Sequence, residues 1–396
     1  MDPIRNPYAP GAGQRPPELA GRDRELEQFA VTLERIAAGR PDRSMVLHGL
    51  RGVGKTVLLN ALRGLAVQRA WGTGKVEARP DRSVRLPLAQ AVHAAIREVA
   101  HRHRDPERVE QVAGVLKAFA LRTDQPDRKG VRWQPPIDVV AARGRGDSGD
   151  LELDLIELFG DVAGLARDLN VGVALFVDEM QDIPAAELAA LCGACHEISQ
   201  QGAPLLLVGA GLPHLPAALA ASKSYAERLF RYVAVDRLPR EMAERAWTLP
   251  AQDEGATYDA KALDELYRLT DGYPYFVQAY GKVTWDVAVT SPITWADVVA
   301  AAPEAEAELA AGFFGTRYER ATPAERDYML AMADLGEDGA DAPVGTAAVA
   351  DRLGRKAQSL SPARDGLIKK GLIYSGERGT VAFTVPHFGR YLRHQH

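Results

Sequence analysis

The sequence predicts an α/β fold with a parallel five-stranded sheet, followed by a helical segment and a C-terminal winged helix. Three observations lead to this prediction. A glycine-rich loop over residues 49–56 separates a short apolar run from a segment of good helix formers. Two more apolar runs, at residues 173–177 and 203–211, have the continuous character of buried parallel strands. Beyond residue 322, three short helical patterns precede an alternating pair of strands.

The bulk composition is that of an ordinary globular chain. Its 396 residues are 46% hydrophobic and 26% charged, and their length suggests two or three domains. The net charge of −5 gives no global basic field, so any DNA contact must come from a local patch. No apolar run approaches the length of a membrane span, and residues 1–18 read as an extended Pro- and Gly-rich arm without a signal-peptide core. We therefore expect a cytoplasmic protein with no membrane partner.

The loop after His48 matches the pattern G-x-x-x-x-G-K-[ST], the Walker A signature of a phosphate-binding loop (P-loop). Its glycines let the backbone curl so that several N–H groups point at phosphate oxygens, and the helix that follows adds the positive end of its dipole. Lys55 is expected to reach the β- and γ-phosphates, and the Thr56 hydroxyl to ligate Mg²⁺. The predicted phosphate-binding residues are Gly49, Leu50, Arg51, Gly52, Val53, Gly54, Lys55, Thr56 and Val57.

An acidic pair, Asp178 and Glu179, follows the apolar run 173–177. At the carboxyl end of an interior strand Asp178 can hold the Mg²⁺ shell, and Glu179 can polarise an attacking water as general base. A solvated acidic pair at a strand end is the alternative. The 123 residues from Lys55 to Asp178 leave room for two helices, a strand and a polar insertion over residues 123–150. We expect residues 72–75 to form a loop ahead of that strand.

Cys192 and Cys195 fit both a haem-attachment and a redox C-x-x-C pattern, with His196 next in the chain. A zinc site needs four ligands, and His196 is the only further ligand nearby. The surrounding segment has a helical pattern, on which both cysteines lie on one face. We therefore predict small buried thiols.

These motifs together resemble the initiator-type branch of the AAA+ ATPases, the relatives of origin-recognition and cell-division-control ATPases. The resemblance runs from about Leu19 onward and rests on GR-x-x-EL at residues 21–26, the Walker A loop, the DEMQD run at residues 178–182 and GAGLPHLP at residues 209–216. It implies that Leu19 and Arg22 lie against the adenine. It also implies an arginine finger at Arg228 or Arg231, with Arg228 slightly favoured; surface ion pairs are the alternative.

The segment Gly272-Tyr-Pro274 resembles the G-x-P motif of the STAND signalling ATPases and of archaeal-type ATPases. The resemblance implies that Pro274 packs near the nucleotide, whereas a simple helix start is the alternative. No arginine stands where the family's sensor is found in the lid, and residues 209–211 carry no polar side chain. Both departures favour tight binding and slow hydrolysis of ATP.

The C-terminal pattern of three helices and a hairpin predicts a winged helix-turn-helix. Thr322 and Glu325 form a capping box with a proline at the first helical position. Further helices are expected over residues 346–354 and 359–371, and a hairpin over residues 372–385. Either DNA or a protein partner can be the target. The residues predicted to meet DNA are Arg355, Lys356, Gln358, Ser359, Ser361, Arg364, Lys369, Lys370 and Arg378.

The predicted organisation is an extended arm (1–18), a P-loop AAA+ ATPase core (19–238), a helical lid (239–315) and a winged helix-turn-helix (316–396). The predicted function is a slow ATPase that acts as a nucleotide-dependent switch, with ATP or ADP and Mg²⁺ as cofactors and double-stranded DNA as partner. A homo-oligomer would complete the site through Arg228 of an adjacent subunit. Two alternatives stay open: a STAND-like switch that docks a protein partner, and a non-hydrolysing nucleotide-binding scaffold.

Overall fold

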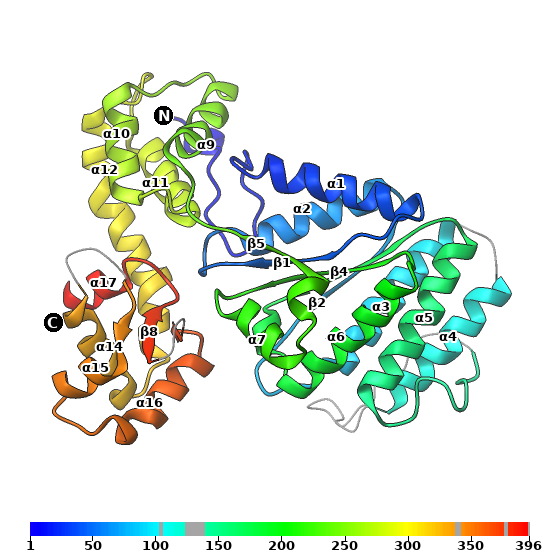
Figure 1. Ribbon diagram of the computed structural model, residues 1–396. Coiled ribbons are helices and arrows are strands. Elements are labelled where there is room, and N and C mark those ends of the chain that lie inside the picture. Colours follow the sequence, from blue (N-terminus) through cyan, green and yellow to red (C-terminus); the bar gives the residue numbers. More distant parts are fainter. Residues whose placement is uncertain (103–105, 123–138, 337–341, 376–378, 395–396) are drawn as a thin grey trace.

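The computed structural model describes residues 1–102, 106–122, 139–336, 342–375 and 379–394. Figure 1 shows an α/β core on one side and, beside it, the helical segment and the C-terminal segment, one above the other. The N-terminal arm crosses from the helical segment to the core. Three parts of the chain therefore meet at one side of the sheet.

The core contains the predicted five-stranded parallel sheet. Its strands are β1 (Ser44–His48), β2 (Gly72–Glu77), β3 (Val173–Asp178), β4 (Leu205–Gly211) and β5 (Phe230–Ala234), in the order β2-β3-β4-β1-β5. All four pairings are parallel, with His48 opposite Gly211 and Val177 opposite Gly209. The carboxyl ends of β1, β3 and β4 thus lie at one edge, where ligands collect in open α/β sheets.

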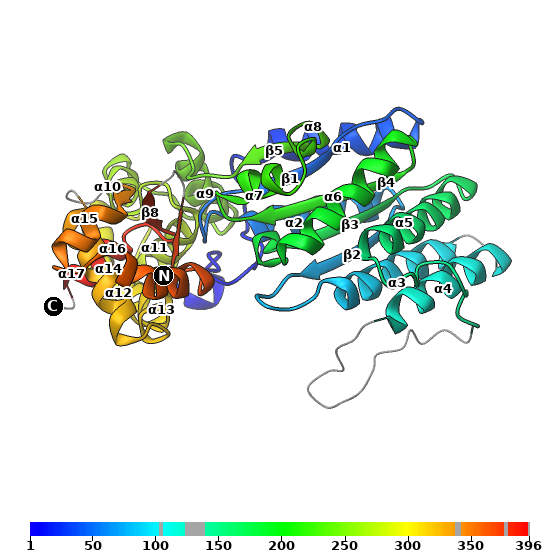
Figure 2. The same cartoon turned by 60° about the horizontal axis from the view of Figure 1, so that its bottom comes forward.

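Helices cover both faces of this sheet (Figure 2). One face carries α1 (Asp23–Ala37) and α2 (Lys55–Gln68); the other carries α3 (Arg85–Arg102), α4 (Pro106–Leu121), α5 (Leu151–Asp168), α6 (Ala185–Gln200) and α7 (Leu215–Ser222). Alternate β1 residues point to opposite faces of the sheet. Met45 and Leu47 belong to the core that includes α1 and α2, and Val46 belongs to the core that includes α3, α5, α6 and α7. Among the described helices, none is long and apolar enough to cross a membrane.

The prediction of a loop at residues 72–75 is wrong, because these residues form the edge strand β2. Helix α3 packs so closely on β2 that a Cβ at Gly74 would lie 2.2 Å from the Ala91 carbonyl oxygen. The glycines therefore permit a close helix–strand approach instead of a turn. The interval before Asp178 also holds more helices than the two expected, namely α3, α4 and α5 besides α2. Of the predicted insertion, residues 123–138 lie outside the described residues, and residues 139–150 form turns without regular structure.

The helical segment follows the core in the chain. It consists of α9 (Arg240–Asp253), α10 (Ala260–Thr270), α11 (Pro274–Val287), α12 (Trp295–Glu308), the π-helix η3 (Leu309–Gly315) and α13 (Thr316–Glu319). Pro274 occupies the first turn of α11, where its missing N–H has no cost. Gly272 precedes it with a φ of +64°, and a Cβ there would meet the Leu238 carbonyl oxygen at 2.1 Å.

The C-terminal segment has the predicted order of three helices and a hairpin. Its elements are α14 (Pro323–Leu335), β6 (Val344–Gly345), α15 (Thr346–Arg352), α16 (Ala357–Lys369), β7 (Ile373–Tyr374), β8 (Thr380–Phe383) and α17 (Phe388–His394). The capping box between Thr322 and Glu325 is present, and the three strands form an antiparallel sheet in the order β6-β8-β7. Arg378, predicted at the hairpin tip, lies outside the described residues.

The N-terminal arm lies against the helical segment and begins with a short 3₁₀ turn, η1 (Pro3–Arg5). Tyr8 is buried, and its hydroxyl hydrogen-bonds to the Trp247 carbonyl (2.7 Å) and to the Tyr258 hydroxyl (2.8 Å). The Asn6 amide donates to the Lys282 carbonyl at 2.9 Å. These contacts hold the arm in place before it enters the core.

Cys192 and Cys195 are both buried in α6, as predicted. Burial is the main cause that raises the pKa of each thiol. The His196 ring stacks on Tyr225 with a centroid separation of 4.2 Å. This packing agrees with a structural role for the segment.

Candidate functional site

The loop between β1 and α2 has the curled backbone that its glycines predict. Gly52 and Gly54 have φ angles of +87° and +92°, which residues with a Cβ rarely adopt. A Cβ at Gly52 would also lie 2.8 Å from the Tyr273 hydroxyl. Val53 is buried between these glycines and anchors the loop. The loop thus passes directly from a buried strand to the N-terminus of α2.

Lys55 is only 8% exposed and lies against its own loop. Its Nζ donates to the carbonyl oxygens of Gly49 (3.0 Å) and Leu50 (2.8 Å). Burial is the largest cause that lowers the pKa of Lys55 to about 8; Glu179 and Asp178 favour the charged form and Arg51 opposes it. The nearby carboxylates therefore do not offset the whole cost of burying the ammonium charge, and the negative charge of a phosphate group could offset the rest.

The two residues predicted to ligate Mg²⁺ lie next to each other. The Thr56 side chain hydrogen-bonds to the Asp178 carboxylate, although burial still raises the pKa of Asp178. Lys75 of β2 lies 3.9 Å from the same carboxylate. A hydroxyl and a carboxylate oxygen are ligands that suit Mg²⁺, so this pair fits the ion.

Glu179 follows β3 with a φ of +50°, a left-handed conformation that is uncommon for a residue with a side chain. The Arg51 Nη1 atom lies 4.0 Å from its Oε1, and the Gln181 amide donates to its Oε2 at 2.7 Å. The side-chain oxygen of Gln181, Oε1, in turn accepts a hydrogen bond from the Leu212 backbone N–H at 3.0 Å. The Gln181 side chain thus connects Glu179 to the residue that follows β4.

Sequence reasoning missed Gln181, which supplies a polar side chain where β4 has none. A Cβ at Gly211 would lie 2.6 Å from the Gln181 Oε1 atom, so the glycine leaves room for the amide. Asp182 lies nearby, and burial together with the charge of Glu179 raises its pKa to about 6. Gly211 is the feature of the sequence that could have indicated a side chain packed closely against the end of β4.

A cavity of about 420 Å³ lies between the loop, the arm and the helical segment. This volume is within the range of ligand pockets. The predicted site residues in its wall are Leu19, Arg22, Arg51, Gly52, Val53, Gly54, Lys55, Thr56, Val57, Glu179 and Pro274. Gly49, Leu50 and Asp178 lie behind this wall, and Arg228 is not part of it.

The charges in the cavity wall favour an anion. Its cations are Arg22, Arg51, Lys55 and Arg317, and its acids are Glu18 and Glu179. Glu18 is already paired with Arg245 outside the wall, at 2.7 Å. The remaining positive excess suits a polyphosphate better than a neutral or cationic ligand.

Arg22 and the arm form a further part of the cavity wall. The Arg22 Nη2 atom donates to the carbonyl oxygens of Asp236 (2.7 Å) and Val53 (3.3 Å), and burial lowers the pKa of the guanidinium. Arm residues 9–14 continue this wall, and a Cβ at Gly13 would lie 3.1 Å from the Thr56 Cγ2 atom. The arm thus covers the loop, a role that the sequence did not reveal.

The two candidate arginine fingers lie away from the loop of their own chain. Arg228 is exposed in the short helix α8 (Ala226–Leu229), before the start of β5. Arg231 lies within β5 rather than before it, and pairs with Asp42 at 3.5 Å. Since Ala234, at the other end of β5, is opposite His48, Arg228 lies at the far end of the sheet from the loop.

The C-terminal segment touches the loop directly, which the sequence did not predict. The Arg51 backbone N–H donates to the Thr384 carbonyl oxygen at 3.0 Å. A Cβ at Gly371 would lie 2.4 Å from the Arg51 Nη2 atom, and Lys369 pairs with Asp81 of the core at 2.8 Å. Lys369, predicted to meet DNA, therefore has an acidic partner within the chain.

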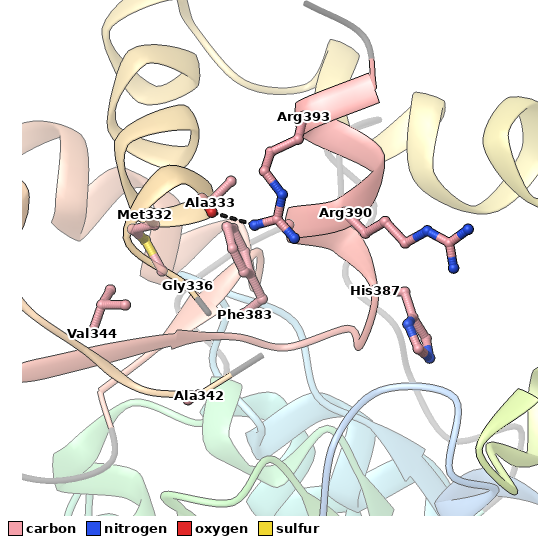
Figure 3. Close-up of a pocket in the computed structure, with 10 residues that line it drawn as sticks. Met332, Ala333, Gly336, Ala342, Val344, Phe383, His387, Arg390 and Arg393 are labelled. Carbon is pink, nitrogen blue, oxygen red and sulfur yellow. Dashed lines mark hydrogen bonds between the residues drawn. The ribbon is translucent and has the colours of Figure 1, made fainter. Parts of the chain in front are cut away.

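Figure 3 shows a second, much smaller hollow within the C-terminal segment, between α14 and α17. Its volume of about 10 Å³ leaves room for no more than one water molecule. The Arg393 guanidinium closes one side by donating to the Ala333 carbonyl, while His387 and Arg390 extend away from that contact. The hollow is a packing defect beside the hairpin, not a second ligand site.

Comparisons with known proteins agree with this geometry. Residues 18–208 match a family described as the AAA ATPase domain, and residues 311–392 match a family described as a domain of unknown function, DUF8462. No curated protein matches the sequence. A Walker-type ATPase of Pyrococcus abyssi is similar in structure, with a TM-score of 0.56 and 15% identity over 96% of this chain and 97% of that chain.

Two further solved structures are more distant. One is the Orc1 protein of Aeropyrum pernix in complex with DNA, with a TM-score of 0.46 and 14% identity over 96% of this chain and 94% of that chain. The other is the RuvB Holliday junction branch migration motor of Thermotoga maritima, with a TM-score of 0.43 and 16% identity over 94% and 96%. These scores are too low to support an argument. Residues 18–208 thus match the AAA ATPase domain, and the chain has the fold of a Walker-type, P-loop ATPase.

Proposed function

We propose that this protein is a slow ATPase that works as a nucleotide-dependent switch. The observation that carries the proposal is the hydrogen bond from the Arg51 N–H to the Thr384 carbonyl, which joins the phosphate-binding loop to the C-terminal segment. A nucleotide on this loop and the docked C-terminal segment cannot be independent, because both use the same few residues. Such a switch needs only different contacts in its two nucleotide states.

In this proposal the nucleotide lies in the 420 Å³ cavity, with its phosphates on residues 49–57. Lys55 binds the β- and γ-phosphates, and Thr56 and Asp178 hold Mg²⁺. Leu19, Arg22 and Pro274, which line the same cavity, bind the adenosine part, as the resemblance to AAA+ ATPases implies. Bound Mg²⁺ would offset the charge of the phosphates, while the residues of the chain orient them.

We propose slow hydrolysis because the carboxylate of Glu179, the proposed general base, already has partners. It accepts a hydrogen bond from Gln181 and has Arg51 at 4.0 Å. Both contacts compete with an attacking water for this carboxylate. This competition supports a switch instead of a fast motor.

Nucleotide binding and turnover test this proposal. Wild-type protein should bind ATP in a Mg²⁺-dependent way and turn it over well below ten times per second, below the usual range for fast enzymes. Glu179→Gln should keep ATP affinity and lose turnover, whereas Lys55→Ala should lose affinity. A wild-type turnover of tens per second without a partner would contradict the switch. ATP binding by the wild type without any turnover would indicate a non-hydrolysing scaffold.

The C-terminal segment is proposed to be a winged helix that binds double-stranded DNA, in line with the resemblance to initiator-type AAA+ ATPases. The element order and the exposed start of α16 support this, since Arg355, Lys356, Gln358 and Ser359 are all exposed. Helix N-termini and basic side chains at this place can meet phosphates and base edges. Lys370 contributes less, because it pairs with the buried Glu325 at 2.5 Å.

Fluorescence anisotropy with a labelled duplex and the full chain tests the DNA proposal. Arg355→Ala with Lys356→Ala should weaken binding and reduce its salt dependence. Arg326→Ala is a matched control, because Arg326 lies in α14, outside α16, and its contacts are with the Tyr318 and Glu319 carbonyls and the Tyr318 ring among the residues that the structure describes. Absence of any duplex binding at low salt, with and without ATP, would exclude DNA as the partner.

One observation favours a protein-docking switch like that of STAND ATPases as the alternative. The C-terminal segment packs on the loop through Arg51, and the G-x-P residues lie at the start of α11 beside the cavity. In this alternative, release of the C-terminal segment exposes a surface for a protein partner. Hydrogen exchange with ADP and with a non-hydrolysable ATP analogue would reveal such release as faster exchange in β8.

A homo-oligomer is proposed to complete the site with Arg228. The arginine is exposed and lies at the far end of β5 from its own loop, so it could act only on a neighbouring copy. Sedimentation with Mg²⁺ and ATP should then reveal assembly. Arg228→Ala should lower turnover without changing the ATP affinity of the isolated chain, and a strictly monomeric protein with full activity would exclude this role.

A further inference from the structure

Arg317 is a charged residue of the cavity wall that the proposed site does not use. It lies in α13, directly after the π-helix η3. We call residues 309–320, where the helical segment joins the C-terminal segment, the hinge. The Arg317 guanidinium lies 4.1 Å from the centroid of the Phe313 ring, and Nη1 donates to the Phe313 carbonyl. Like Arg51 and Lys55, it lines the cavity.

The charge of Arg317 lacks an acidic partner among the residues that the structure describes. None of the ion pairs between those residues includes Arg317. The cavity residue whose charge acts on Arg317 is a second cation, Arg51. Burial is the largest cause that lowers the pKa of Arg317, and Arg51 lowers it further. A half-buried guanidinium beside a like charge is unfavourable, so its position is best explained by an anion that completes the site.

The position of Arg51 indicates which part of a ligand Arg317 would meet. Arg51 extends from the loop towards Glu179, the proposed base, at 4.0 Å. A triphosphate bound along the loop has its terminal phosphate at this end. We propose that Arg317 binds the terminal phosphate of ATP from within the same chain, an inference that rests on nucleotide binding in this cavity. The planar guanidinium suits this role because it can donate two parallel hydrogen bonds to one phosphate group.

The surroundings of Arg317 connect this contact to the C-terminal segment. Phe313, under the guanidinium, stacks on Tyr275 of α11 with centroids 4.5 Å apart. The next residue, Phe314, stacks on Tyr391 of α17 at 5.2 Å. An arginine that turns from Phe313 to a phosphate changes the packing of this aromatic group. The hinge would thereby distinguish ATP from ADP and pass the difference to α17.

Affinities for Mg²⁺-ATP and Mg²⁺-ADP, measured with fluorescent nucleotides on the full chain, test the proposal. Arg317→Ala should weaken ATP binding about tenfold or more, as expected for a charged hydrogen bond to phosphate, and change ADP binding by about twofold or less. Arg317→Lys should fall between the two. Arg320→Ala is the matched control, because Arg320 is an exposed cation near Arg317 that does not line the cavity; it should affect both nucleotides equally and far less than Arg317→Ala does.

Arg317→Gln guards against a folding defect, because it keeps part of the side-chain packing and can still donate to the Phe313 carbonyl. Selective loss of ATP affinity in this variant, with an unchanged unfolding temperature without nucleotide, supports the proposal. Equal loss for ATP and ADP, or no loss for either, overturns it while nucleotide binding stands. If wild type binds neither nucleotide, or Lys55→Ala binds both as wild type does, the proposed function itself fails, and the Arg317 variants are not needed to decide this.

Discussion

Nucleotide binding should weaken above pH 8, because the free protein holds Lys55 where its charge is unfavourable. Burial lowers the pKa of Lys55 to about 8, and the nearby carboxylates of Glu179 and Asp178 oppose this only in part. Phosphate oxygens beside Nζ would favour the charged form and raise the pKa again. Binding of a nucleotide is therefore linked to proton uptake, and the linkage acts above the pKa of the free protein.

The structure sets the size of this effect. The shift from 10.5 to about 8 corresponds to about 3 kcal/mol in favour of the neutral amine. Affinity should therefore fall by up to about tenfold for each pH unit above 8. Complex formation should take up about 0.1 proton at pH 7, about 0.5 at pH 8 and about 0.9 at pH 9. Asp182, with a pKa raised to about 6, titrates below this window.

Calorimetry of ATP binding in two buffers with different ionisation enthalpies measures this uptake directly. Lys55→Arg is the control, because arginine keeps the positive charge but does not titrate in this range. Its proton uptake should vanish even if its affinity changes. A wild-type uptake that stays constant between pH 7 and pH 9, or an equal uptake in Lys55→Arg, would refute the reasoning.

Three further substitutions should change stability, each measured by chemical denaturation. Tyr8→Phe removes both hydroxyl hydrogen bonds that hold the arm and should cost about 1–2 kcal/mol; a cost near zero would mean that the arm is not docked in solution. Gly74→Ala should cost about 1–3 kcal/mol or more, because its Cβ would meet the Ala91 carbonyl at 2.2 Å, whereas Gly64→Ala, with open space around its Cβ, should be neutral or stabilising. Asp154 forms an ion pair with the buried Arg85. Asp154→Asn should therefore cost about 3–5 kcal/mol, because it leaves Arg85 without its carboxylate partner, and a neutral result would contradict this ion pair.

The parts of the fold that sequence patterns predicted are those built from neighbouring residues. The apolar run before Gly49, the curled loop and the helix from Lys55 all lie within one short segment, and each follows local rules of glycine freedom and helix propensity. The capping box at Thr322 and Glu325 is similarly local. These elements also fix the edge of the sheet where the candidate site lies.

The edge strand β2 was missed because its local pattern contradicts its structure. Gly72 and Gly74 lower β propensity and normally indicate a turn. Only the contact with α3, whose backbone leaves no room for a Cβ at either residue, explains why glycine is favourable there. This contact depends on the tertiary packing of α3 on β2. The local sequence pattern of a strand carries no information about such packing.

The missed site residues share a different cause, namely their distance along the chain from the loop. Gln181 lies beside Leu212, Thr384 beside Arg51, and Arg317 in the wall of a cavity that begins with the arm. No periodicity connects such residues, because their contacts depend on how the core, the helical segment and the C-terminal segment pack. The sequence therefore predicts a phosphate-binding loop, but not the residues that surround it.

Arg51 explains why the surroundings matter for function. Its backbone N–H contacts the C-terminal segment at Thr384, while its side chain extends towards Glu179 and past Gly371. A phosphate group that draws the guanidinium inwards would change both contacts at once. Since coupling between two binding events is reciprocal, whatever the nucleotide does to the docking of the C-terminal segment, docking does equally to nucleotide affinity. A partner that captures the C-terminal segment would thus alter nucleotide affinity without touching the nucleotide.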